Sequence, residues 1–126
     1  MTRKVLIVDD SKLARMSAAK VLKALHPDWV MVEAGDATQA YASVDRESPD
    51  FVLLDYNMPG KDGLTLAAEL RESNAEIQVA VISANHQVEV IERARASGAA
   101  FIRKPLTETA LADFLNGAPG PSESAR

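Results

Sequence analysis

The sequence predicts an α/β fold in which helices cover both faces of a doubly wound parallel sheet, giving a three-layer αβα sandwich. Short apolar runs recur along the chain, and segments with helical periodicity separate them. The runs are rich in β-branched residues and lack strict alternation, which is typical of strands buried on both faces of a parallel sheet. The predicted strands are 5–8, 51–54, 77–82 and 99–102, with 29–32 as a less regular fifth.

Helices are expected between the strands, joined to them by right-handed crossovers. The first follows Asp10 and ends before Pro27. The second begins at Asp36, which has the spacing of a capping box with Gln39, and it ends at Ser48. Three further helices are expected at about 64–73, 87–97 and 107–117, and Gly98 is the expected left-handed end of the fourth.

The first helix has two distinct faces. One face is apolar and is expected to pack on the sheet. It comprises Ala14, Ala18, Val21, Leu22 and Leu25. The other face is basic, with Lys12, Arg15, Lys20 and Lys23.

Composition restricts the class of function. A chain of 126 residues holds one ordinary domain, which we place at 1–117, followed by a flexible tail at 118–126 rich in Pro, Gly and Ser. The net charge of −4 disfavours direct binding of nucleic acid, and the absence of cysteine excludes disulfides and thiolate chemistry. No apolar run is long enough for a signal peptide or membrane insertion, so a cytoplasmic location is expected.

Polar residues follow four of the predicted strands, at the edge where open α/β sheets build ligand sites. Each has a structural explanation when taken singly, such as a turn or a helix cap. Their occurrence in strand order predicts a common site. The residues are Asp9 and Asp10 after the first strand, Asp55 after the third, Ser83 after the fourth, and Lys104-Pro105 after the fifth.

This set of residue types fits phosphoryl chemistry. Three carboxylates that converge repel one another unless a cation lies among them, and oxygen-only ligands favour Mg²⁺. Lys104 and Ser83 would complete a cradle for a phosphoryl group. Asp55 could itself be the nucleophile, because carboxylates form acyl phosphates.

As a set, these residues resemble the receiver domain of two-component response regulators, and the resemblance extends from residue 3 to about 116. The matching motifs are Asp9-Asp10, the run 53–60 followed by Asp62-Gly63, Ser83-Ala84 and Lys104-Pro105. The resemblance implies a flavodoxin-like sheet of order 2-1-3-4-5, as in single-domain chemotaxis regulators.

The resemblance also implies a role for each residue of the predicted site. Asp55 would accept a phosphoryl group from the phosphohistidine of a sensor histidine kinase or a phosphotransfer protein. Lys104 would pair with the phosphoryl oxygens, and its bond to Pro105 would be cis. The implied Mg²⁺ ligands are Asp10, Asp55 and the backbone carbonyl of Asn57, with Asp9 acting through a water molecule.

The resemblance further implies a conformational switch and an output surface. Ser83 and Phe101 match the switch residues, and Asn57 and Asn85 stand where the family tunes hydrolysis of the aspartyl phosphate. A downstream target protein would contact the surface formed by the fourth helix, fifth strand and fifth helix. The expected activity is self-phosphorylation at Asp55 followed by hydrolysis, which is not turnover of an external substrate.

Three alternatives differ in class. A Mg²⁺-dependent phosphatase of the haloacid dehalogenase type requires a second Asp two positions after the nucleophile, where this chain has Asn57. A flavin or nucleotide binder would need a Ser/Thr/Gly-rich phosphate loop in place of Asp9-Asp10. A receiver that serves only as a scaffold, without phosphorylation, is the third, and the complete acidic set argues against it.

Overall fold

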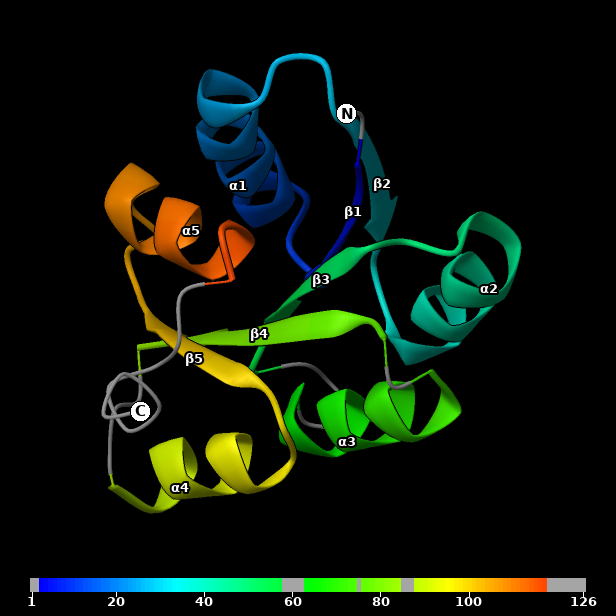
Figure 1. Ribbon diagram of the computed structural model, residues 1–126, viewed down its shortest axis with the longest axis vertical. Helices are drawn as coiled ribbons and strands as arrows, with labels where there is room; N and C mark the ends of the chain where they lie inside the picture. Colours follow the sequence, from blue (N-terminus) through cyan, green and yellow to red (C-terminus); the bar gives the residue numbers. More distant parts are fainter. Residues whose placement is uncertain (1–2, 58–62, 75, 85–87, 118–126) are drawn as a thin grey trace.

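The computed structural model describes residues 3–57, 63–74, 76–84 and 88–117, and its five parallel strands form one sheet of order β2-β1-β3-β4-β5 (Figure 1). This is the predicted fold class and strand order. The strands are β1 (Lys4–Val8), β2 (Val30–Ala34), β3 (Phe51–Asp55), β4 (Gln78–Ser83) and β5 (Ala100–Arg103). The helices are α1 (Lys12–Leu25), α2 (Ala37–Glu47), α3 (Gly63–Ser73), α4 (Val88–Ala96) and α5 (Glu108–Leu115).

Helices cover both faces of the sheet, with α1 and α5 on one side and α2, α3 and α4 on the other (Figure 1). Because side chains alternate along a strand, each strand contributes to two separate cores. On β1, Val5 and Ile7 face α1 and α5, whereas Leu6 and Val8 face the other three helices. The central strand β3 is buried along its whole length.

The same alternation determines where the predicted site residues emerge. Asp9 continues the Val5 and Ile7 side of β1, and Asp55 continues the Phe51 and Leu53 side of β3. β1 and β3 are hydrogen-bonded neighbours. The two carboxylates therefore leave adjacent parallel strands at the same edge and on the same face of the sheet.

The least regular predicted strand differs most from its prediction. β2 begins at Val30, one residue later than expected, and extends two residues further to Ala34. The backbone N–H of Trp29 donates to the carbonyl of His26 at 3.1 Å, so Trp29 belongs to the turn before the strand. Its ring stacks with those of His26 and Phe51, at 3.8 and 5.8 Å between ring centroids. An edge strand has one partner only, so its ends are set by such local packing.

Capping side chains start three of the helices. Ser11 and Thr107 accept hydrogen bonds from the third backbone N–H after them, at the start of α1 and α5 respectively. At α2, Asp36 accepts from the N–H of Gln39, as predicted, but the Gln39 side chain accepts from Gly35 rather than from Asp36 itself. Thr107 was predicted to be inside the last helix and is its N-cap instead.

Gly98 has φ = 85°, the left-handed conformation expected after α4. The tail 118–126 lies outside the described residues, so the domain boundary at 117 stays a prediction. No helix in the described ranges combines the length and hydrophobicity that a membrane span requires.

Candidate functional site

Three carboxylates converge at the carboxyl ends of β1 and β3. Asp9, Asp10 and Asp55 each offer an oxygen, and these oxygens lie within 4.8 Å of one another. Asp9 and Asp55 are 9% and 6% exposed, whereas Asp10 is exposed to solvent. The structure thus brings together three acidic residues that come from the ends of two separate strands.

Lys104 supplies a cation to this cluster. Its Nζ lies 2.8 Å from Oδ1 of Asp55. Lys104 directly follows β5. Its backbone N–H donates to the carbonyl oxygen of Ser83 at 3.0 Å, and this hydrogen bond holds Lys104 beside the end of β4. The Lys104–Pro105 peptide bond is cis, the isomer that the resemblance implies.

Burial raises the pKa of the Asp9 carboxyl above its ordinary value, and the nearby negative charges of Asp55 and Asp10 act in the same direction. The N–H of Ser11, which donates to Asp9 Oδ1 at 2.9 Å, and the charge of Lys104 oppose this shift. A bound cation would offset the mutual repulsion of these carboxylates and the cost of burying their charge. The donors are all hard oxygens, so their chemistry fits Mg²⁺.

The remaining predicted residues lie at different depths. Ser83 is the last residue of β4 and is 1% exposed. Phe101, on β5, is partly buried against the core that α2, α3 and α4 cover. Asn57 follows β3 and is exposed, whereas Asn85 lies outside the described residues.

Gly63, the first residue of α3, is a contributor that sequence reasoning did not single out. A Cβ at this position would lie 2.5 Å from the carbonyl oxygen of Asp55 and 2.9 Å from the Cα of Tyr56. The N–H of Gly63 donates to the Tyr56 carbonyl at 2.9 Å. Glycine therefore lets α3 approach the backbone of the acidic site. The Asp62-Gly63 pair is the sequence signal for this position.

The sequence predicts Arg15 on the basic outer face of the first helix, but the structure places its side chain against the end of β1. Its side chain is 17% exposed, and its Nη1 donates to the backbone carbonyl of Asp9 at 2.6 Å. Helical side chains lean toward the helix N-terminus, so a residue in the first turn of α1 can reach back to the strand end. Spacing from Asp10 was the signal that could have identified it.

A cavity of about 480 Å³ opens beside the acidic cluster. Its walls are mostly apolar and come from α1, the sheet and the segment after β5. Asp9, Asp55 and Lys104 are among its lining residues. The carboxylates therefore border an accessible space rather than a closed core.

Comparison with known proteins agrees with this architecture. Residues 5–116 match the family described as the response regulator receiver domain. The chain is 36% identical over 106 residues to the transcriptional regulatory protein PdtaR of Mycobacterium tuberculosis, covering 83% of this chain and 51% of PdtaR. It is 32% identical over 117 residues to the chemotaxis protein CheY of Bacillus subtilis, covering 92% of this chain and 97% of CheY.

Among solved structures, the signal receiver domain of the NarL response regulator from M. tuberculosis superposes with a TM-score of 0.81. The two are 33% identical, and the match covers 94% of this chain and 98% of that domain. The chain spans only about half the length of several curated relatives, PdtaR among them.

The family match covers most of the chain, and the sheet order and the acidic cluster are those expected of the same family. The chain belongs to the response regulator receiver domains of two-component signalling.

Proposed function

We propose that Asp55 accepts a phosphoryl group from the phosphohistidine of a sensor histidine kinase or a phosphotransfer protein. The observation that carries this proposal is the position of the Asp55 carboxylate, which lies within 4.8 Å of oxygens of Asp9 and Asp10 and 2.8 Å from the ammonium of Lys104. A nucleophile in that position has a cation beside it to stabilise charge on the incoming group. Receiver domains are generally signalling modules rather than turnover enzymes, and the proposal keeps this one in that class.

The proposed transfer is an in-line displacement. A carboxylate oxygen of Asp55 forms a bond to phosphorus while the phosphorus–nitrogen bond of the phosphohistidine breaks. The electron pair of that bond returns to the imidazole nitrogen, and the product is an acyl phosphate on Asp55. Lys104 moves its ion pair from the Asp55 carboxylate to the phosphoryl oxygens, which carry the charge after transfer.

Mg²⁺ is the proposed cofactor. Asp9, Asp10 and Asp55 would hold it, together with the backbone carbonyl of Asn57. When bound it neutralises the carboxylates and the phosphoryl charge, which is the chemistry that this cluster otherwise lacks. The support is the close approach of three hard-oxygen donors and the raised pKa of Asp9.

The output would be a change in protein contacts. Phosphorylation adds close to two negative charges, which can bias a two-state element. Ser83 would move its hydroxyl to the phosphoryl group, and Phe101 would turn into the space left behind. The target would read the surface of α4, β5 and α5, where Val88 is 68% exposed. Neither direct nucleic-acid binding nor membrane insertion is part of the proposal, which assumes a cytoplasmic location.

Hydrolysis would return the domain to its resting state. Asn57 and Asn85 are the proposed tuning residues, because amides at these positions could orient or block the attacking water. The lifetime of the acyl phosphate follows from the decay of the modified mass after the donor is removed.

Intact-mass spectrometry tests the proposal. The chain is incubated with Mg²⁺ and a small acyl-phosphate donor, beside an Asp55→Asn variant and an EDTA control. Gain of one phosphoryl mass by the unaltered protein alone supports acceptance at Asp55. An adduct that persists in the Asp55→Asn variant contradicts the assignment of the acceptor. Absence of any adduct, together with failure to bind a beryllofluoride mimic, favours the scaffold alternative.

A further inference from the structure

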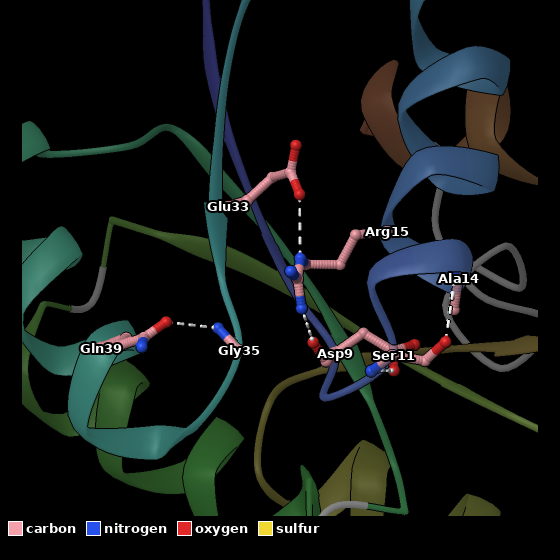
Figure 2. A network of polar contacts seen from close by, with 7 residues as sticks. All are labelled: Asp9, Ser11, Ala14, Arg15, Glu33, Gly35 and Gln39. Atoms are coloured by element: carbon pink, nitrogen blue, oxygen red, sulfur yellow. Dashed lines mark hydrogen bonds and ion pairs between the residues drawn. The ribbon is translucent and has the colours of Figure 1, made fainter.

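Arg15 connects the acidic site to the edge strand of the sheet (Figure 2). Its Nη1 donates to the backbone carbonyl of Asp9 at 2.6 Å, and its Nε donates to Oε1 of Glu33 at 2.8 Å. Glu33 lies on β2, and its side chain is 46% exposed. The guanidinium is therefore held between a partly buried backbone carbonyl and a carboxylate at the surface.

Asp9 is held by three hydrogen bonds, each to a different group. Its N–H donates to the carbonyl of Ala34 at 3.1 Å, and its Oδ1 accepts from the N–H of Ser11 at 2.9 Å. Arg15 holds the third group, the carbonyl oxygen. That oxygen belongs to the planar peptide that leads to Asp10, so fixing it also fixes the direction in which Asp10 leaves.

We propose that Arg15 is a positioning residue for the metal-binding loop. It holds the peptide between Asp9 and Asp10 so that both carboxylates stay within reach of Asp55, and Glu33 orients Arg15 for this task. The inference rests on the metal site of the proposed function. It adds Arg15 and Glu33, neither of which is a proposed metal ligand.

The charge of Arg15 and its hydrogen bonds are expected to have opposite effects on the affinity for Mg²⁺. A positive charge near a cation site lowers the affinity for the cation, so charge alone predicts that removal of Arg15 tightens Mg²⁺ binding. Positioning predicts that removal weakens it. Lysine retains the charge but cannot serve two acceptors through one planar fork, so Arg15→Lys changes the geometry alone.

The test is a Mg²⁺ titration of the full chain, followed by backbone amide chemical shifts. The same spectra report whether each variant is folded. For Arg15→Lys we expect binding about tenfold weaker, the lower end of what loss of an outer-shell partner usually does to metal affinity. Arg15→Ala is expected to bind more weakly than the unaltered chain despite losing the repulsion.

Arg46→Lys is the matched control. Arg46 makes an exposed ion pair with Glu47, at 3.2 Å between Nε and Oε2, and its side chain is 66% exposed. We expect its Mg²⁺ affinity to be unchanged. Binding by folded Arg15→Lys within twofold of the unaltered chain, or tighter binding by Arg15→Ala, would overturn the proposal.

Glu33→Ala tests whether the ion pair with Glu33 orients Arg15. The side chain that it removes is 46% exposed, so the substitution leaves no cavity in the core. Loss of an exposed ion pair is expected to weaken Mg²⁺ binding about two- to fivefold. The double variant should bind no more weakly than Arg15→Lys, because Glu33 acts through Arg15. No effect of Glu33→Ala, or a full additional loss in the double variant, contradicts the linkage.

Phosphorylation rates separate positioning from general damage. Arg15→Lys should raise the Mg²⁺ concentration for half-maximal phosphorylation by about the same tenfold and leave the maximal rate little changed. A lower maximal rate with unchanged half-saturation contradicts positioning. If the unaltered chain binds no Mg²⁺, the metal of the proposed function fails. If it binds Mg²⁺ and the variants match it, only the role of Arg15 fails.

Discussion

The ammonium of Lys104 lies 2.8 Å from Oδ1 of Asp55, and the two side chains differ greatly in exposure, at 39% and 6% respectively. The carboxylate is therefore fixed in the protein, whereas the lysine reaches it from a solvent-accessible position. Such a pair can separate and let the lysine follow charge onto a group bound to Asp55, whereas a fully buried ion pair could not separate as readily.

Replacement of this lysine should impair phosphoryl acceptance more than metal binding. We expect Lys104→Met to be phosphorylated about 10²- to 10³-fold more slowly, which is the usual effect of removing one group that stabilises transition-state charge. Mg²⁺ affinity should stay the same or increase, because a nearby positive charge is lost. Time courses of intact mass at saturating Mg²⁺ measure the first quantity, and a Mg²⁺ titration measures the second.

Arg103→Met provides the control for the loss of a cation at the end of β5. Arg103 is exposed and neighbours Lys104 in sequence, but no ion pair to the acidic cluster is seen for it within the described residues. Its rate should match that of the unaltered chain. Similar slowing in both variants would mean that net charge, rather than the contact with Asp55, is responsible.

Gly63 should be intolerant of even one methyl group. Its Cβ would lie 2.5 Å from the Asp55 carbonyl oxygen, so Gly63→Ala requires α3 or the strand end to shift. We expect a loss of about 1–3 kcal/mol in the free energy of unfolding, as for other overpacked sites. Phosphorylation should also slow, because the displaced backbone carries the acceptor.

Gly35→Ala is the comparison in urea denaturation. A Cβ there meets only the ends of the Arg15 and Gln39 side chains, at 3.4 Å, and we expect a change within about 0.5 kcal/mol. If the two alanine variants unfold at the same urea concentration, the close approach of α3 to Asp55 is not tight in solution.

Much of the fold could be predicted because its signals are local. Each buried strand appears as an apolar run, and Asp36 marks the start of α2. The carboxylates of the site could be predicted because parallel strands end at a common edge. The edge strand β2 was less well predicted, since the backbone of Trp29 closes a turn with His26 that the apolar pattern does not indicate.

Arg15 and Gly63 show what sequence patterns leave out. Arg15 has the spacing of an exposed helical residue, and its contact with Asp9 depends on how α1 packs beside the end of β1. Gly63 is required by the distance between α3 and the backbone of Asp55, which follows from the crossover between β3 and α3. Both contacts are consequences of tertiary packing, so the Asp62-Gly63 pair and the spacing of Arg15 from Asp10 could mark the residues but not show what they contact.

Mg²⁺ should stabilise the folded chain through the acidic cluster. A ligand that binds only the folded state at 100 times its dissociation constant adds about 2.7 kcal/mol to the free energy of unfolding. We expect Asp10→Asn to lose most of this gain, because Asp10 is a proposed metal ligand. The residue is exposed, so its replacement should not disturb the packing of the domain. Thermal unfolding with and without Mg²⁺ measures the effect. Asp113→Asn, an exposed substitution on α5, should keep the full gain. Equal stabilisation of both variants would mean that the ion binds elsewhere.

Asp9 should destabilise the metal-free protein at neutral pH. Its pKa is raised from the ordinary value of 3.8, first by burial and then by the charges of Asp55 and Asp10. The folded state therefore favours the protonated carboxyl. This contribution to stability is complete below the pKa of the unfolded chain and is lost as the pH rises through the raised pKa of the folded chain.

Asp9→Asn removes that penalty and retains an oxygen to accept the hydrogen bond from Ser11. In EDTA at pH 7, we expect the variant to be more stable than the unaltered chain, because its side chain carries no charge to be desolvated. The difference should shrink as the pH falls through the raised pKa and vanish below about pH 3, where both chains are neutral at this position.

Urea denaturation across this pH range measures the difference in stability, with Asp45→Asn on the exposed side of α2 as the control. Saturating Mg²⁺ should reverse the order at pH 7, since the ionised carboxylate is then compensated by the cation. A difference that does not change with pH would mean that the gain comes from packing and not from the charge of Asp9.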